Sequence, residues 1–376
     1  MAIHPSTKLL GILADNVMIE KILQSMAFRK FGFPKVPPLN LTIGLTNTCN
    51  SRCLTCNIWK KSSENDLSLN ELDKIFQNIG PTLEWLILSG GEPFLRKDIV
   101  EICASAYKYC KPSIIVIPTN GILFNIIPKK VEEILKKCPK SRVTINLSLD
   151  GLNQKHDEIR NIKGNWELAI KTFNSLKKLK KYKNLELGIH TVISKLNYKE
   201  IPELYAYVKN ILKPDEYITE IAEKRVELET LDLEHSPDYK EYSYAINFLS
   251  NELKKQKLSI KQLFRLKYYN LVKVWLKKHT QILPCYGGFA SAQIAQNGDV
   301  WPCCVRADVL GNLREENYNF KKIWFNKKAK EVRKSIKNKE CSCPLASASY
   351  INLMCDQKTI INICFNFLGE KLKCMH

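Results

Sequence analysis

The chain has 376 residues, 45% of them hydrophobic, which suits a folded protein with a large core and excludes wholesale disorder. Its 58 Lys and Arg against 38 Asp and Glu give a formal net charge of +20. This charge suits an anionic partner (nucleic acid, a membrane surface or an acidic substrate) or is simply a solvated basic surface. Fourteen cysteines, with no recognisable secretory signal or membrane span, predict the cytoplasm and metal ligation in place of disulfides.

Residues 1–38 form a separate N-terminal segment with apolar residues near helical spacing. A basic and aromatic run, FRKFGF at residues 28–33, ends it before Pro34. We predict an amphipathic helix that either packs on the rest of the protein or lies in a membrane interface with its apolar face in lipid. The apolar residues of this pattern are Leu9, Leu10, Leu13, Val17, Ile22, Leu23 and Met26.

Three cysteines, Cys49, Cys53 and Cys56, follow a strand-like run at residues 41–45 with the spacing C-x3-C-x2-C. Thiolates suit iron–sulfur clusters or zinc. A structural zinc site would need a fourth nearby Cys or His, and none lies between Thr46 and Leu83. Three ligands instead leave one iron of a [4Fe–4S] cluster open to a substrate or cofactor, although a zinc site closed by a distant residue stays an alternative.

This motif resembles that of the radical S-adenosylmethionine (SAM) enzymes. The resemblance implies that the amino and carboxylate groups of SAM chelate the open iron. One electron, from a donor such as flavodoxin or ferredoxin, then releases a 5′-deoxyadenosyl radical that abstracts hydrogen from a substrate. The residue before the third cysteine, often aromatic in the family and packed on adenine, is Thr55 here, so adenine must pack on another group.

From residue 39 onward, strand and helix patterns alternate six times. The alternation predicts a parallel sheet, and we expect an α/β fold, a partial (β/α)6 TIM-type barrel over residues 39–230, as the resemblance also implies. Active sites of such barrels form at the carboxyl ends of the strands. The strand patterns lie at residues 41–45, 85–88, 114–117, 143–149, 185–192 and 217–221. The helical patterns between them include residues 69–79, 99–110, 131–137 and 166–178.

A glycine-rich loop, Gly90-Gly91-Glu92-Pro93, follows the second strand pattern. The two glycines permit a tight turn and a close approach to a ligand, and the proline fixes the exit of the loop. By resemblance this is the GGEP loop of the family, whose backbone and carboxylate hold the ammonium group of SAM.

Other SAM contacts are implied by resemblance at the next two strand ends. Asn120 would lie near the ribose, Ser148 would bond the ribose hydroxyls, and Arg160 would pair with the SAM carboxylate through its planar fork. The plain alternatives are a strand-end turn for Ser148 and an exposed helix charge for Arg160. We expect His156 and Asp157 to be structural caps.

The region after the barrel changes character twice. Residues 214–243 are acidic and predict the sixth strand followed by a linker. Residues 251–280 hold nine Lys or Arg and one acid and predict a basic amphipathic helix. Within this 231–283 segment, the helix either lies on an anionic surface or covers the barrel with its lysines outward. Nucleic-acid binding is disfavoured because no recognition fold is visible.

A cysteine-rich unit, residues 284–376, closes the chain, and we expect a small α+β domain. Residues 295–303 predict a hairpin with an Asn297-Gly298 turn, which brings Cys285 and Cys303 within reach of each other. The unit resembles the SPASM or twitch auxiliary-cluster domain of radical SAM enzymes.

This unit departs from the full SPASM pattern of seven cysteines, because only the C-x-C pair at 341–343 and Cys355 stand where the last cysteine run would be. We therefore expect one auxiliary [4Fe–4S] cluster, with structural zinc as the alternative. The first-choice ligands are Cys285, Cys303, Cys341 and Cys343, with Cys304 and Cys355 as substitutes. Three cysteines on apolar helical faces, Cys103, Cys110 and Cys138, are expected in the core.

The sequence thus predicts a radical SAM enzyme that acts on an unidentified substrate with help from the auxiliary cluster. The apolar N-terminal helix, the basic segment and the apolar run 360–368 favour an anionic or lipid-linked substrate and peripheral contact with an anionic membrane. The SPASM-like unit favours the alternative, a maturase that modifies a ribosomal peptide or protein. A non-catalytic electron carrier is disfavoured because it needs neither an open iron nor the 90–93 loop.

Overall fold

The computed structural model describes residues 16–256 and 258–372. Helix α2 (Asn16–Phe31) covers the described part of the predicted N-terminal helix. Met18, Ile22 and Phe28 of α2 are buried in the main hydrophobic core, so this helix packs on the rest of the protein. The predicted helical residues Leu9, Leu10 and Leu13, together with Cys374, lie outside the described residues.

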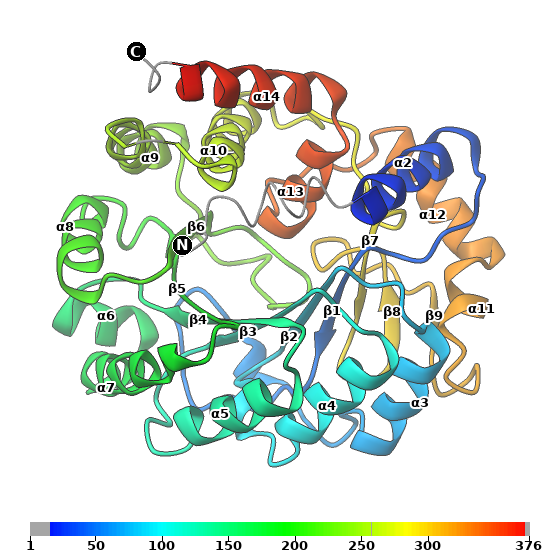
Figure 1. Cartoon of the computed structure of the whole chain (residues 1–376), viewed down its shortest axis with the longest axis horizontal. Helices are drawn as coiled ribbons and strands as arrows, with labels where there is room; N and C mark the ends of the chain where they lie inside the picture. Colours follow the sequence, from blue (N-terminus) through cyan, green and yellow to red (C-terminus); the bar gives the residue numbers. More distant parts are fainter. Residues whose placement is uncertain (1–15, 257, 373–376) are drawn as a thin grey trace.

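One nine-stranded sheet organises the fold, in the order β6-β5-β4-β3-β2-β1-β7-β8-β9. Its first six strands are parallel and form the predicted partial barrel, with helices on the outer face (Figure 1). The register keeps strand ends level, for example Gly44 beside Ser89 and Ser148 beside His190. The six strands are β1 (Asn40–Gly44), β2 (Trp85–Ser89), β3 (Ile114–Thr119), β4 (Arg142–Ser148), β5 (Leu185–Ile193) and β6 (Glu216–Ile221).

Three of the outer helices begin and end within one residue of the predicted patterns 69–79, 99–110 and 166–178, and a fourth begins four residues before the predicted 131–137. Ser68 caps the first of them with a capping box that includes Glu71, the signal expected at a helix start. The helices are α3 (Leu69–Ile79), α4 (Ile99–Tyr109), α5 (Ile127–Lys137), α6 (Asn153–Arg160), α7 (Asn165–Lys177) and α8 (Ile201–Tyr207).

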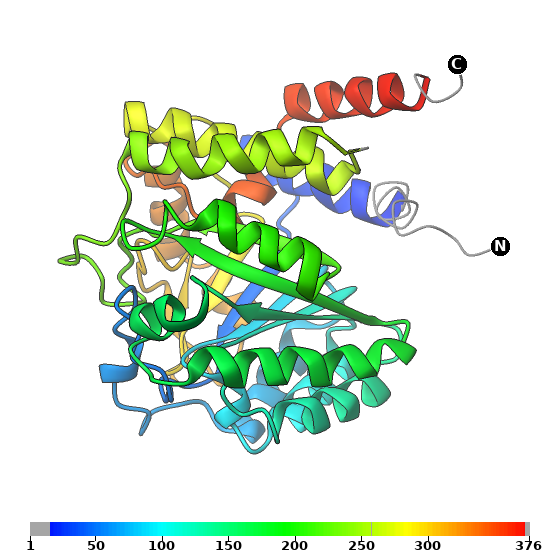
Figure 2. The same ribbon diagram turned by 90° about the vertical axis from the view of Figure 1, so that its left-hand side faces the viewer.

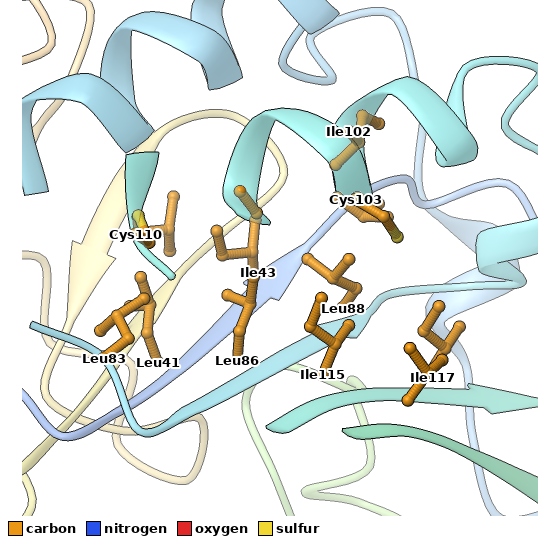
Figure 3. Close-up of a cluster of buried hydrophobic side chains, with 14 of the residues drawn as sticks. Leu41, Ile43, Leu83, Leu86, Leu88, Ile102, Cys103, Cys110, Ile115 and Ile117 are labelled. Atoms are coloured by element: carbon orange, nitrogen blue, oxygen red, sulfur yellow. The ribbon is translucent and has the colours of Figure 1, made fainter. Parts of the chain in front are cut away.

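Successive side chains of each strand point to opposite faces of the sheet, one towards the outer helices and the next towards the barrel interior. In β2, Leu86 and Leu88 are fully buried and pack beneath α4, where Ile102 and Cys103 meet them (Figure 3). Trp85 and Ile87 of the same strand line the barrel interior. The three cysteines predicted in the core, Cys103, Cys110 and Cys138, are all fully buried, which confirms that prediction.

The predicted C-terminal hairpin is present, but it does not form a separate sheet. β7 (Ser291–Ile294) pairs in parallel with β1, and β8 (Asp299–Trp301) returns antiparallel to β7. A short strand, β9 (Gly311–Asn312), completes the edge. The barrel and the cysteine-rich unit therefore share one sheet and one hydrophobic core. The helices of this unit are α11 (Phe320–Trp324), α12 (Lys327–Lys337), α13 (Ala346–Met354) and α14 (Gln357–Leu372).

Two long helices, α9 (Tyr239–Lys254) and α10 (Ile260–Lys278), lie over the open side of the barrel (Figures 1 and 2). The basic helix predicted over residues 251–280 is divided, because α9 ends at Lys254 and Ser259 caps the start of α10. The apolar residues Leu263, Phe264 and Tyr268 of α10 are buried. Lys261 and Arg265 form ion pairs with Glu216 of β6. The helix thus covers the barrel, and two of its basic residues form ion pairs that line the barrel cavity. Among residues 16–256 and 258–372, every helix is too short or too polar to cross a bilayer.

Candidate functional site

A cavity of about 590 Å³ runs through the barrel interior to the carboxyl ends of its strands. Its lining includes the three clustered cysteines, Cys49, Cys53 and Cys56, which are half-buried. The C-terminal unit contributes Gln293 and Cys304 to the same cavity. The cavity thus lies between the two cysteine-rich parts of the chain.

The GGEP loop packs against the residues that lead into the cysteines. Gly91 N donates to Thr46 O at 2.7 Å, and Glu92 N donates to Thr48 O at 2.9 Å. A Cβ at Gly91 would lie 2.2 Å from Thr48 O, and Gly90 has a φ of +127° with its Cβ position 2.4 Å from Thr46 O. Only glycine fits such contacts, so both glycines are needed to hold the cysteine loop at the barrel mouth.

The carboxyl end of α6 fixes the middle of the cysteine loop. Leu54 N donates to Ile159 O at 2.9 Å, and Arg52 N donates to Arg160 O at 3.2 Å. The last carbonyls of a helix lack partners within the helix, and here the loop amides satisfy them. The loop therefore has a defined backbone course that presents its thiols to the cavity.

The thiols of this loop fit a metal cluster. Burial raises the pKa of Cys49 to about 11 and that of Cys56 to about 12, and metal binding replaces the proton of such a thiol. Ser51 Oγ lies 3.2 Å from Cys53 Sγ, and Arg160 Nη1 donates to the same sulfur at 3.5 Å. A [4Fe–4S] cluster binds each cysteine through a different iron.

Glu92 of the GGEP loop has a structural role that the sequence did not reveal. Its side chain is 1% exposed and accepts hydrogen bonds from Phe94 N, Thr119 Oγ1 and Asn120 N. Burial raises its pKa to about 7. The carboxylate therefore ties the loop to the end of β3, and most of its acceptor capacity is used within the protein. Pro93 begins the short helical turn that follows.

Asn120 and Ser148 lie where the sequence analysis expected them, at strand ends facing the cavity. Asn120 Nδ2 donates to Asn50 Oδ1 at 2.8 Å, which connects the end of β3 to the cysteine loop. Ser148 is the last residue of β4 and stands beside His190 of β5. Their contacts with the ribose remain predictions.

Arg160 is a buried ion-pair partner and not an exposed helix charge. Its Nη2 lies 2.7 Å from Asp150 Oδ2, and Asp150 is 2% exposed at its side chain. The Nε of Arg160 has no hydrogen-bond partner among the described residues, so one donor remains for a ligand. The pairing of Arg160 with the SAM carboxylate remains a prediction.

His156 and Asp157 are structural, as predicted. His156 Nδ1 accepts from Asp150 N at 3.1 Å. Asp157 accepts from Gly164 N at 2.6 Å and from Trp166 N at 2.7 Å, which satisfies free amides at the start of α7.

The four first-choice auxiliary ligands interact electrostatically with one another. Burial raises the pKa of Cys285, Cys303 and Cys343, and neighbouring sulfurs of the set, which include Cys341, raise it further. Of the substitutes, Cys304 packs with Cys303 and Cys343 but also lines the barrel cavity, near Glu227 and Arg225. Cys355 is buried near Arg29 of α2. This arrangement supports the first-choice set.

The acidic stretch after β6 was expected to be a linker, but it forms part of the cavity wall. We define the 220–227 wall by its four charged residues that line the cavity, namely Glu220 at the end of β6 and Glu223, Arg225 and Glu227 after it. The fifth charged residue of this stretch, Lys224, is exposed. Arg225 Nη2 lies 3.0 Å from Glu223 Oε1 and 3.3 Å from Glu220 Oε2. The following backbone contacts the cysteine loop, where Asn57 N donates to Leu228 O at 2.9 Å. The position of this stretch in the sequence could have predicted its role, because it directly follows the carboxyl end of a barrel strand, where active sites form.

A partial barrel with three cysteines at its mouth, joined to a second cysteine group, defines a class of iron–sulfur enzymes with an open cluster. Family models agree: that of the radical SAM superfamily matches residues 43–208, and that of the SPASM iron-sulfur cluster-binding domain matches residues 285–344. The chain belongs to the radical SAM superfamily and carries a SPASM domain. Its cofactors are a SAM-binding [4Fe–4S] cluster and an auxiliary iron–sulfur cluster.

Related enzymes have different substrates. The chain is 26% identical over 306 residues to the AdoMet-dependent heme synthase of Methanosarcina barkeri, covering 75% of this chain and 80% of that one. It is 31% identical over 164 residues to the Fe-coproporphyrin III synthase of the same organism, covering 43% of this chain. That match spans only 38% of the synthase. It is also 33% identical to a Helicobacter pylori GTP 3′,8-cyclase, covering 45% of this chain and 52% of the cyclase.

Solved structures share the fold at low sequence identity. SuiB of Streptococcus suis bound to S-adenosylmethionine has a TM-score of 0.63 at 16% identity and covers 90% of this chain and 79% of SuiB. The enzyme anSMEcpe with bound AdoMet has a TM-score of 0.57 at 18% identity and covers 80% of this chain and 84% of anSMEcpe. Both confirm the fold that the sequence predicted.

Proposed function

We propose that this radical SAM enzyme abstracts hydrogen from a substrate held in the barrel cavity, between the two cysteine groups. The observation that carries the proposal is the shared cavity, which Cys49, Cys53 and Cys56 line from the barrel and Cys304 lines from the SPASM domain. A group at this place would lie near both cofactors.

The residues around the mouth have separate proposed roles. Cys49, Cys53 and Cys56 would hold the cluster, which supplies the electron that cleaves SAM to the 5′-deoxyadenosyl radical. The backbone of Gly90 and Gly91 would accept the SAM ammonium group, because the Glu92 carboxylate is largely engaged. Arg160 would bind the SAM carboxylate through its free Nε.

The SPASM domain would provide the second redox partner. Cys285, Cys303, Cys341 and Cys343 would hold one [4Fe–4S] cluster, and Cys303 directly precedes the cavity-lining Cys304. This continuity supports a short route for an electron between a substrate in the cavity and the auxiliary cluster.

A cysteine replacement tests the barrel assignment. Anaerobically reconstituted wild-type protein with SAM and dithionite should form 5′-deoxyadenosine, and the Cys53→Ala variant should not. The triple Cys49/Cys53/Cys56→Ala variant should retain about half of the roughly eight iron atoms expected from two clusters. A Cys53→Ala variant that forms 5′-deoxyadenosine at the wild-type rate would disprove the assignment.

For partners, we propose an electron donor such as flavodoxin or ferredoxin and peripheral contact with an anionic membrane. The exposed aromatic residues Phe31 and Phe33, 72% and 75% exposed, support the membrane contact because Lys30 lies beside them. An anionic or lipid-linked substrate is one candidate. A peptide or protein substrate is the other, supported by the fold shared with SuiB, which was also solved bound to precursor peptide SuiA.

A further inference from the structure

The 220–227 wall contains a buried carboxylate oxygen without a donor. Glu223 is 7% exposed and lines the cavity. Arg225 binds its Oε1 through Nε at 3.1 Å and Nη2 at 3.0 Å. Its Oε2 is buried and has no hydrogen-bond partner among the described residues. Buried acceptors are normally paired, so this oxygen indicates a place for an external donor.

A second unsatisfied polar atom lies on the same loop. His235 is 5% exposed and lines the same cavity, and its Nδ1 has no hydrogen-bond partner in the described part of the chain. The His235 ring lies close to the backbone of both Glu223 and Leu233. Two residues of one loop, each with a buried polar atom that has no hydrogen-bond partner among the described residues, thus line one cavity, which is more than a cluster of acidic side chains.

The charged side chains around Glu223 favour the binding of a cation. Glu220, Glu223 and Glu227 provide three carboxylates against one guanidinium, that of Arg225. The neighbouring Arg160 is already paired with Asp150. Two auxiliary-set thiols, Cys303 and Cys343, also interact electrostatically with Glu223, and thiolates that bind a cluster add negative charge. An anionic group would be repelled here, and a cation would be attracted.

We propose that the reacting portion of the substrate carries a protonated primary amine, which donates to Glu223 Oε2. An ammonium group is compact and has three donors, so it can donate to Glu223 Oε2 and keep donors for other acceptors of the cavity wall. This inference rests on the proposed function, because it specifies the substrate of that same cavity. The outer surface of the protein is basic and the wall is acidic, so long-range attraction and local recognition act on different parts of the substrate.

The test measures binding of n-butylammonium, n-butyrate and n-butanol to the full-length, anaerobically reconstituted protein with SAM, by ligand-observed NMR titration. We expect n-butylammonium to bind with a millimolar Kd and the other two to bind at least about tenfold more weakly, as loss of a charge-assisted hydrogen bond predicts. Glu223→Gln should weaken n-butylammonium binding about tenfold. Glu234→Gln is the matched control, because Glu234 lies on the same loop with its side chain 77% exposed.

Circular dichroism and iron content check that each variant is folded. Glu223→Asp keeps the charge but has a shorter side chain, so its carboxylate oxygens lie further back, and it should bind n-butylammonium with intermediate strength. This variant replaces Glu223→Gln in the test if Glu223→Gln does not fold. Equal amine binding by wild type and both Glu223 variants, preferred binding of n-butyrate, or no amine binding would overturn the inference. Formation of 5′-deoxyadenosine, measured on the same samples, reports on the proposed function separately.

Two further probes identify the source of the amine. Nα-acetyl-lysine amide represents a peptide side chain, and glycerophosphoethanolamine represents a lipid headgroup. We expect at least one of them to bind more tightly than n-butylammonium. The probe that binds more tightly indicates the source of the amine. Weaker binding of both would count against a substrate amine at Glu223.

Discussion

At the scale of single residues, the neighbouring cysteines Cys303 and Cys304 have different surroundings. Cys303 lies with Cys285 and Cys341, whereas Cys304 faces Arg225 and Glu227 in the cavity. Cys304 lines the cavity and Cys303 does not, so we assign Cys303 and not Cys304 to the auxiliary set.

We therefore expect Cys303→Ser to lose about half of the iron of the reconstituted protein, because one of the two clusters loses a ligand. Cys304→Ser should retain nearly all of it. Iron and sulfide analysis after anaerobic reconstitution measures both. Loss of iron from the Cys304 variant alone would show that the assigned ligand set is wrong.

The effect of the Asp150–Arg160 pair on the barrel cluster can be tested by the direction in which the midpoint potential shifts. Arg160 donates to Cys53 Sγ at 3.5 Å and lies 2.7 Å from Asp150. Positive charge beside a cluster ligand stabilises the reduced cluster. Arg160→Met should lower the midpoint potential of the barrel cluster, and Asp150→Asn should raise it, each by an amount on the order of tens of millivolts. Redox titration followed by EPR measures both, and shifts of the same sign in the two variants would contradict this account.

At the scale of helices and strands, one ion pair joins α3 of the barrel to the SPASM domain. Arg314 donates to Glu71 through Nε at 2.6 Å and through Nη2 at 3.2 Å. Tyr318 OH donates to the same carboxylate at 3.2 Å. The hydrogen bond from Arg314 is the main reason that the pKa of Glu71 falls to about 2 from its usual 4.5.

This pair should stabilise the protein above pH 4.5, where Glu71 is ionised in both the folded and the unfolded chain. The contribution should be lost as the pH falls from 4.5 towards 2, because the folded protein then binds a proton less readily than the unfolded chain. The pair is partly solvated, so Glu71→Gln should cost only about 1 kcal/mol of unfolding free energy at neutral pH. Urea unfolding at neutral pH and at pH 3 measures the difference, which should shrink at the lower pH. Glu64→Gln, at an exposed position nearby, is the control and should have no such effect.

At the scale of the whole molecule, the net charge of +20 does not define the active site. The basic α10 packs over the barrel and commits Lys261 and Arg265 to the interior. The predicted membrane contact through residues 251–280 therefore has less support than contact through the end of α2. There, Lys337 of α12 donates to Lys30 O at 3.4 Å, which brings further basic charge to Phe31.

We expect the protein to sediment with anionic vesicles at low salt and much less with neutral vesicles, since each basic residue near an anionic surface contributes roughly 1 kcal/mol. Phe31→Ser with Phe33→Ser should remove the part of binding that survives high salt, because each inserted Phe contributes about 1.5–3 kcal/mol. Ile211→Ser is the control, since Ile211 is 61% exposed just beyond α8, on the other side of the molecule from α2 (Figure 1). Equal, negligible sedimentation with both vesicle types would leave the charge as a solvated surface and favour a peptide substrate.

The sequence by itself determined the barrel and both cysteine groups. Strand periodicity and turn residues are local properties, so β1 to β6 and helix α3 begin and end close to the predicted residues. Cys49, Cys53 and Cys56 are close in the chain, and the Asn297-Gly298 turn formed the expected hairpin. Such features depend on neighbouring residues, which a single sequence displays.

Only the tertiary structure decided how distant segments meet. It placed β7 beside β1, which makes one sheet of two expected domains. It turned part of the expected linker into the 220–227 wall and placed Cys304, but not Cys303, in the cavity lining. It also paired Arg160 with Asp150 and engaged Glu92 at the end of β3. These contacts join residues far apart in the chain, and they depend on how sheets and helices pack, which local composition does not encode.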